Sequence, residues 1–135
     1  MLPSKIVIAS ALLLNANKDL VVVRKHTSNF YMLPGGKVEE GESFSQTLIR
    51  ELREELGLNF TPEEFEYLGQ HETSAVNEKN TTVQGNIFML KHALDILPDA
   101  HAELAEVLFI PQQHYKNYQL AHLLQEFALP IWLAQ

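Results

Sequence analysis

Three glutamates in the middle of the chain have a spacing that suits a metal ion. Glu51, Glu54 and Glu55 are separated by one, three and four positions, so on a helix they are surface neighbours that repel one another by about 0.2 to 0.5 kcal/mol per pair. A hard divalent cation such as Mg²⁺ or Mn²⁺ would relieve this repulsion, because it binds carboxylate oxygens. The alternative is a solvated acidic surface partly neutralised by Arg50 and Arg53. The helix alone leaves both interpretations open.

The sequence around these acids predicts the helix that would carry them. Apolar residues recur at helical spacing from Phe44 to Leu56, which is typical of a helix with one buried face. Ser43 and Gln46 form a capping-box pattern at the start, and Gly57 suits a left-handed cap at the end. The three glutamates would then lie in the second half of the helix, at the border of its apolar face, where the helix dipole disfavours anions.

The rest of the chain indicates a mixed α+β domain. Two apolar runs joined by the turn-forming segment at 15–19 predict a hairpin, and a last helix is expected to end before Pro130. A short helical turn is expected at 61–64. The predicted strands span 6–14, 20–24, 30–33, 67–73, 81–92 and 107–110, and the last helix spans 120–129. With no repeats or linkers, residues 1–135 are expected to form one domain with a mixed sheet and flanking helices.

Composition narrows the function further. The 135 residues carry a formal net charge of −7, which disfavours binding to a nucleic-acid polymer. The chain has no cysteine, which rules out disulfides and thiolate metal sites. The first apolar run is too short to cross a bilayer, so we expect no membrane association and a cytoplasmic location. None of the six histidines has the spacing of a metal site.

The segment from Gly36 to Leu58, GKVEEGESFSQTLIRELREELGL, is similar to the Nudix box in every fixed position. These positions are Gly36, Glu42, Arg50, Glu51, Leu52, Glu54, Glu55, Gly57 and Leu58. The resemblance implies the Nudix fold, an α/β/α sandwich around a mixed β-sheet. It also implies Mg²⁺-dependent hydrolysis of a nucleoside diphosphate linked to another group, with Mn²⁺ as a substitute ion. A homodimer is compatible with it, because many family members are dimers.

The same resemblance implies roles for individual residues. Arg50 is expected to hold a box glutamate, Glu51 or Glu42, by a bidentate contact. Glu51 and Glu54 are expected to serve in catalysis, together with Arg50. The metal ligands would be the carboxylates of Glu51, Glu54 and Glu55 and a backbone carbonyl at Gly35 or Gly36.

The general base and the substrate contacts do not follow from the box. Glu103 and Glu106 are the downstream candidates for the base, and we favour Glu106. Arg24 and Lys25 could bind phosphates, and the polar segment 74–86 is the expected specificity loop. Two aromatic residues could stack on a base, although residues of this kind beside a strand are more often in the core: Phe30 and Tyr31.

Markers of several Nudix subgroups are absent outside the box. No proline follows the box at the distance typical of the ADP-ribose group, and no tyrosine stands where the dinucleoside polyphosphate group has one. The expected substrate is therefore a small nucleoside triphosphate or a modified nucleotide, including an oxidised one. The alternative is a non-catalytic Nudix domain that senses a nucleotide or regulates a partner.

Overall fold

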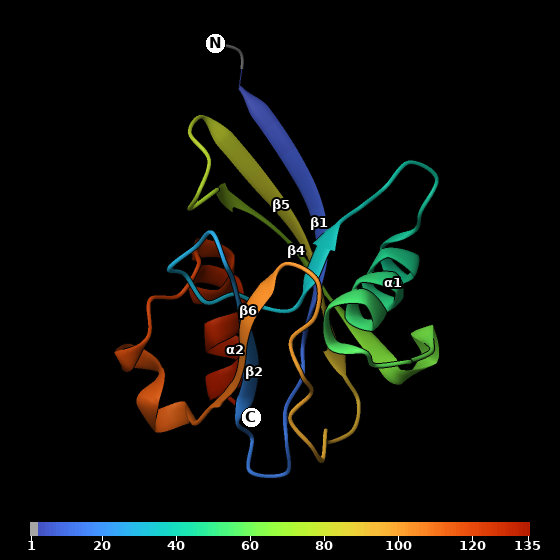
Figure 1. The fold of residues 1–135 in the computed structure, drawn as a ribbon, viewed down its shortest axis with the longest axis vertical. Helices are drawn as coiled ribbons and strands as arrows, with labels where there is room; N and C mark the ends of the chain where they lie inside the picture. The colour runs from blue at the N-terminus through green and yellow to red at the C-terminus, as the bar shows by residue number, and fades with distance from the viewer. Residues whose placement is uncertain (1–2) are drawn as a thin grey trace.

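The computed structural model describes residues 3–135, and its centre is a four-stranded mixed sheet (Figure 1). The strand order is β3–β1–β5–β4, in which β1 and β5 run parallel and the other two pairs run antiparallel. The strands are β1 (Ser4–Leu12), β3 (Gly35–Lys37), β4 (Phe65–Ser74) and β5 (Thr81–Leu90). Residues 1 and 2, which the predicted single domain includes, lie outside the described residues.

A second, two-stranded sheet pairs β2 (Leu20–Lys25) with β6 (Leu104–Ile110) in antiparallel register. The predicted hairpin is therefore only partly right. The chain does turn at 15–19, where Leu14 and Leu20 form an isolated bridge and the Asn15 side chain accepts hydrogen bonds from the backbone N–H groups of Asn17 and Asp19. Beyond this turn the two strands separate, because β2 takes β6 as its partner.

The predicted strand at 30–33 is wrong. Tyr31 and Met32 form only single bridges, to Leu120 and Val23. The regular strand, β3, lies a few residues later, where Gly35 pairs with Ser10 of β1. It begins the glycine segment, residues 35–41, which contains Gly35, Gly36 and Gly41. A β-carbon at Gly35 would collide with the Ala9 carbonyl oxygen, so the missing side chain is what allows β3 to approach β1.

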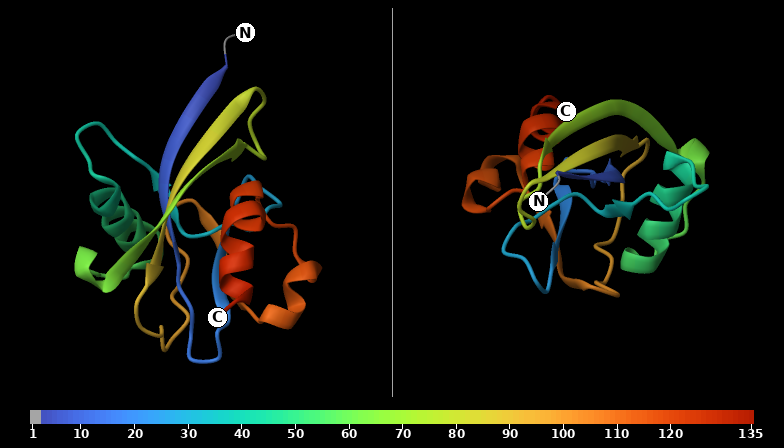
Figure 2. Two further views of the ribbon diagram at one scale, coloured as in Figure 1. Left: turned by 180° about the vertical axis from the view of Figure 1, so that it is seen from behind. Right: turned by 90° about the horizontal axis from the view of Figure 1, so that it is seen from above.

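The helices cover both sides of the strands (Figures 1 and 2). Helix α1 (Phe44–Leu56) lies on one side, with the predicted capping box at Ser43 and the left-handed cap at Gly57, φ 67°. The C-terminal helix, the helical segment 122–133 that includes η3 (Leu124–Ala128) and α2 (Leu129–Leu133), lies on the other side. The short helices η1 (Pro62–Glu64) and η2 (Gln112–Asn117) connect strands and helices at the surface.

The predicted end of the last helix before Pro130 is wrong. The helical segment continues through a π turn, η3 (Leu124–Ala128), into α2 (Leu129–Leu133), which contains Pro130 in its first turn. In the π turn the Leu129 N–H donates to the Leu124 carbonyl, five residues back. A wider turn of this kind makes room for a residue that lacks an N–H and whose ring crowds the preceding turn.

Two apolar cores explain why segments 6–14 and 20–23 are apolar at every position except Ser10. Leu13 and Val21 pack with Leu48 and Leu52 of α1, whereas their neighbours Leu12 and Val22 pack in a second core, which also contains Leu124 and Trp132 of the C-terminal helix. Strands buried on both faces read as continuous apolar runs. The fold is therefore the expected α/β/α sandwich, with one core on each side of the strands. Among residues 3–135, none of the helices combines the length and hydropathy needed to cross a bilayer.

Candidate active site

A cavity of about 400 Å³ opens between β1, β3, α1 and the C-terminal helix. One end is acidic and lies against the glycine segment. The opposite end is bounded by the loop between β4 and β5 and by the C-terminal helix, and the walls between are mainly aliphatic. The acidic end is formed by Glu39, Glu51, Glu55 and Glu103, together with Gly35 and Gly36.

At this acidic end one helix glutamate, Glu55, is buried and a second, Glu51, is partly buried. The Glu55 residue is 3% exposed, and burial, followed by the charge of Glu51, raises its pKa to about 8. Burial also raises the pKa of Glu51, against the opposing effect of the Arg50 guanidinium. Both carboxyl groups thus lie where negative charge is costly without a nearby cation.

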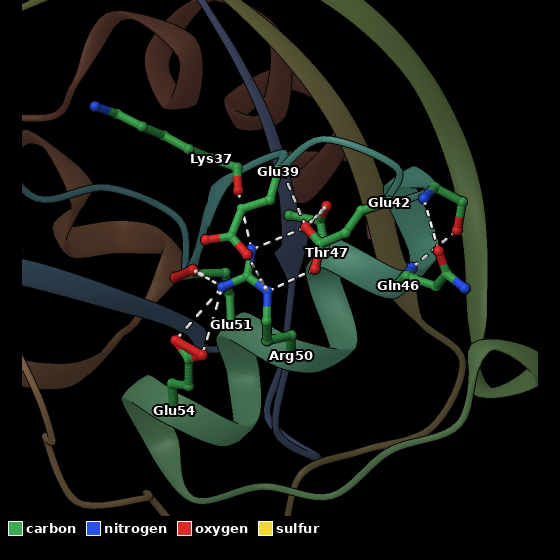
Figure 3. A network of polar contacts seen from close by, with 9 residues as sticks. Lys37, Glu39, Glu42, Gln46, Thr47, Arg50, Glu51 and Glu54 are labelled. Atoms are coloured by element: carbon green, nitrogen blue, oxygen red, sulfur yellow. Dashed lines mark hydrogen bonds and ion pairs between the residues drawn. The ribbon is translucent and has the colours of Figure 1, made fainter.

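Arg50 connects the loop to the helix (Figure 3). Its Nε and Nη2 donate to the two carboxylate oxygens of Glu42 at 2.6 and 2.9 Å, and Nη1 donates to Glu51 Oε2 at 2.7 Å. Nη2 also donates to the Lys37 carbonyl at 3.1 Å. The bidentate contact expected from the sequence is therefore made with Glu42, and Glu51 receives a single hydrogen bond.

The glycines bring backbone against the buried acids. The Gly35 N–H donates to Glu55 Oε1 at 3.5 Å. A β-carbon at Gly36 would collide with the Glu51 side chain. The space that a side chain would take at position 36 is thus filled by a carboxylate that reaches the cavity.

The donor set fits Mg²⁺ chemically. Among residues 3–135, no group of three or more His, Asp or Glu side chains is arranged to enclose a metal ion. Mg²⁺ does not need such a cage, because it commonly keeps several waters and takes one or two carboxylates together with substrate phosphates. Glu51 and Glu55 supply the two carboxylates, beside backbone that no side chain covers.

Comparison with known proteins identifies the family, because residues 5–127 match the NUDIX domain model. The chain belongs to the Nudix family.

Curated relatives of this Nudix domain carry names of nucleotide-hydrolysing enzymes. An 8-oxo-dGTP diphosphatase of Escherichia coli (strain K12) is 38% identical over 45% of this chain and 49% of its own length. A CTP pyrophosphohydrolase of the same organism is 44% identical over 52% of this chain and 43% of its own length. A putative 8-oxo-dGTP diphosphatase of Bacillus subtilis (strain 168) is 27% identical over 83% of this chain and 70% of its own length. The matches to the first two 8-oxo-dGTP diphosphatases span about half of those proteins, 49% and 54%.

Solved structures confirm the Nudix fold. A structure from a study of MutT from Aliivibrio salmonicida and Vibrio cholerae has a TM-score of 0.65 at 21% identity and covers 98% of this chain and 99% of its own. A bifunctional NMN adenylyltransferase/ADP ribose pyrophosphatase from Francisella tularensis has a TM-score of 0.71 at 22% identity, over 100% of this chain and 42% of its own.

Several residues predicted for the Nudix site lie outside the cavity lining. The Glu54 side chain is about half exposed and contacts Arg50 Nη1 only at 3.4 and 3.5 Å. Glu106 Oε1 accepts hydrogen bonds from Arg24 Nε and from the Tyr31 hydroxyl, each at 2.8 Å, and these contacts lower the pKa of Glu106. Phe30 does not line the cavity either. The predicted roles in catalysis or substrate binding are therefore not favoured by the geometry for four residues: Arg24, Phe30, Tyr31 and Glu106.

Other residues of the cavity were missed or ranked second by sequence reasoning. Glu103, the second candidate for the general base, lines the cavity with its Oε1 at 3.8 Å from the Nζ of Lys25. Lys25, a predicted phosphate-binding residue, lines the cavity as well. Ser10 lies on the cavity floor, and His122 lines the cavity with its Nδ1 at 3.0 Å from the Ser74 carbonyl. The one available signal was strand alternation, which places Ser10 on the same face of β1 as Ile6 and Ile8.

Proposed function

We propose that this Nudix domain is a divalent-metal-dependent pyrophosphohydrolase that acts on a small nucleotide. The observation that carries the proposal is the buried carboxyl of Glu55 next to the partly buried one of Glu51, beside the uncovered backbone of Gly35 and Gly36 at one end of a cavity of about 400 Å³. This volume is in the range of small-molecule sites. A diphosphate bound at the acidic end requires a cation, because four glutamates would otherwise repel it.

The metal ligands in this proposal are Glu51, Glu55 and a carbonyl of Gly35 or Gly36. A Mg²⁺ ion held by these groups would supply three effects: neutralised diphosphate charge, a polarised phosphoryl group and a water of lowered pKa. Arg50 holds Glu51 against the loop through the contacts with Glu42 and Lys37. Glu54 remains a candidate ligand, although its side chain would have to leave Arg50 and turn inward.

Glu103 is the better placed candidate for the general base. Its carboxylate lines the cavity at the acidic end, whereas that of Glu106 is held by Arg24 and Tyr31. A carboxylate in hydrogen-bond reach of the attacking water can accept its proton. Lys25 lies beside Glu103 and is the cation best placed to meet a phosphate oxygen.

The substrate class follows from the cavity and from the relatives. The aliphatic walls, among them Ile6, Ile8 and Leu123, suit the flat face of a nucleobase. The names of the relatives point to oxidised purine and cytidine triphosphates. We therefore propose a nucleoside triphosphate, oxidised or unmodified, as the substrate. Action on a small molecule and not a nucleic-acid polymer, a cytoplasmic location and a homodimer stay predictions from the sequence.

A substrate panel tests the proposal. The protein is incubated with 8-oxo-dGTP, dGTP, CTP, ADP-ribose and a dinucleoside polyphosphate in Mg²⁺, and products are separated by chromatography. We expect release of a nucleoside monophosphate and inorganic diphosphate from at least one triphosphate, and loss of this activity in Glu51→Gln. Nucleotide binding by folded protein without any product would contradict the proposal and favour a sensor.

A further inference from the structure

The Ser10 side chain is a buried hydroxyl without a hydrogen-bond partner in the protein. The residue is 2% exposed, and none of the side-chain hydrogen bonds of residues 3–135 involves its Oγ. Every completely enclosed polar side-chain atom in this part of the chain does have a partner. The small exposed fraction of Ser10 therefore includes the hydroxyl, and the opening it faces is the cavity that Ser10 lines.

Ser10 contrasts with the other buried hydroxyls. The Thr47 hydroxyl donates to Glu42 at 2.7 Å, and the Ser28 hydroxyl contacts the Asn77 side chain and accepts from the Phe30 N–H. Because the Ser10 hydroxyl makes no hydrogen bond to the protein, it lacks the stabilisation that the other two hydroxyls gain from their partners. A ligand that hydrogen-bonds to Ser10 Oγ would explain why a hydroxyl group occupies this position.

The position of Ser10 indicates which part of a ligand it would meet. On β1 the residues Ile6, Ile8 and Ser10 point to the same face and line the cavity floor. Ser10 pairs with Gly35, and its Oγ would lie 2.6 Å from a β-carbon built there. The hydroxyl is thus next to the glycine end of the cavity, whereas Ile6 pairs with Val83 further from that end.

We propose that the Ser10 hydroxyl hydrogen-bonds to the bound nucleotide where its sugar joins the first phosphate. This inference rests on the proposed function, because it takes the diphosphate to bind at the glycine end and the base to lie over the aliphatic floor. Ser10 is then a specificity-determining residue that favours nucleotides over inorganic diphosphate. No proton transfer is assigned to it.

The test compares ligand affinity with stability in Ser10→Ala. Affinities for CMP, 8-oxo-dGMP and inorganic diphosphate are measured by calorimetry in Mg²⁺, and Tm is measured without ligand. We expect the variant to bind the tighter of the two monophosphates about three- to tenfold more weakly, as loss of one hydrogen bond predicts. Its affinity for inorganic diphosphate should be unchanged. Its Tm should be equal to or above that of the wild type, because an unpaired buried hydroxyl is removed.

Thr47→Ala is the matched control for stability, because it removes a buried hydroxyl that does have a partner, and we expect its Tm to fall. Ser10→Cys keeps the shape of the side chain with a weak donor and should reproduce the loss of affinity. Unchanged monophosphate affinity in both Ser10 variants would overturn the proposal, as would a fall in Tm as large as that of Thr47→Ala. Wild-type protein that binds neither monophosphate would also overturn it, whereas binding without hydrolysis of triphosphates would count only against the proposed function.

Discussion

Two glutamates near the start of β6 differ in what surrounds their carboxylates. Glu103 lines the cavity beside Lys25, and Glu106 is tied to Arg24 and Tyr31. If Glu103 accepts the proton of the attacking water, Glu103→Gln should lower kcat by about a hundredfold or more. Steady-state kinetics on the preferred triphosphate would measure this effect.

Glu106→Gln is the matched control for that experiment. It leaves a polar side chain between Arg24 and Tyr31, at a pair that is partly exposed. The expected change in the free energy of unfolding is no more than about 1 kcal/mol, with kcat near the wild-type value. A larger loss of kcat in Glu106→Gln than in Glu103→Gln would reject Glu103 as the base.

The contacts of some of these residues can be predicted from the sequence better than those of others, because some contacts are local and others are not. The Arg50–Glu42 contact joins positions within one local motif, so the resemblance of that motif to the Nudix box points to it as one of two possible contacts of Arg50. The position of Glu106 depends on the pairing of β6 with β2, which sets Glu106 opposite Arg24. That register joins residues 82 positions apart, and no local pattern reports it. Ser10 was missed because strand alternation does not reveal which face of β1 borders a cavity.

At the scale of elements, the glycine segment and α1 form one unit. Within this unit, glycine is needed for space at Gly36 and for backbone conformation at Gly41. At Gly36 a methyl group would collide with the Glu51 side chain, whereas at Gly41 it would meet no atom within 4 Å, but the backbone has φ +83°. Gly36→Ala should therefore displace Glu51 and abolish most activity.

Gly41→Ala should lower the free energy of unfolding by about 1 kcal/mol, because an L residue is strained at positive φ, and it should leave kcat within about twofold of the wild type. Kinetics and urea unfolding of both variants give the two quantities. Equal losses of kcat would show that the segment needs glycine for its backbone conformation and not for the space beside Glu51.

The contact between Glu42 and Arg50 gives this unit a pH dependence. Hydrogen bonds from Arg50, from the Glu39 N–H and from Thr47 lower the pKa of Glu42 from 4.5 to about 2. Since the folded-state pKa is the lower one, the contact stabilises the fold above about pH 4.5 and is lost as the pH falls towards 2. The difference in Tm between wild type and Glu42→Gln should therefore be larger at pH 6.5 than at pH 3. A difference independent of pH would show that the charge of Glu42 contributes nothing.

The ends of α1 were predictable and the limits of other elements were not. Ser43, Gln46 and Gly57 act through backbone groups within one turn, so their types identify the ends. Strand β3 depends on its fit against β1, and the helix around Pro130 depends on a π turn packed in the second core. Tertiary contacts decide both, and these contacts lie outside the local sequence.

At the scale of the whole molecule, the cavity exists because two layers meet across the strands. Helix α1 brings the acids from one side, and the C-terminal helix closes the other end with Ala121, His122 and Leu123. The fold class follows from the sequence, since strands that are apolar at nearly every position must be covered on both faces. The cavity between the layers does not, because it is formed by segments from both ends of the chain.

We propose above that this molecule uses a divalent cation at Glu51 and Glu55 to hydrolyse a nucleotide anhydride. Hydrolysis of CTP and 8-oxo-dGTP in ¹⁸O-labelled water, with Mg²⁺ and with a chelator, tests it most directly by mass spectrometry of the products. We expect a nucleoside monophosphate and inorganic diphosphate, with one ¹⁸O in one of the two products, formed with Mg²⁺ and not with the chelator. Absence of products in Mg²⁺, or the same rate in the chelator, would contradict it.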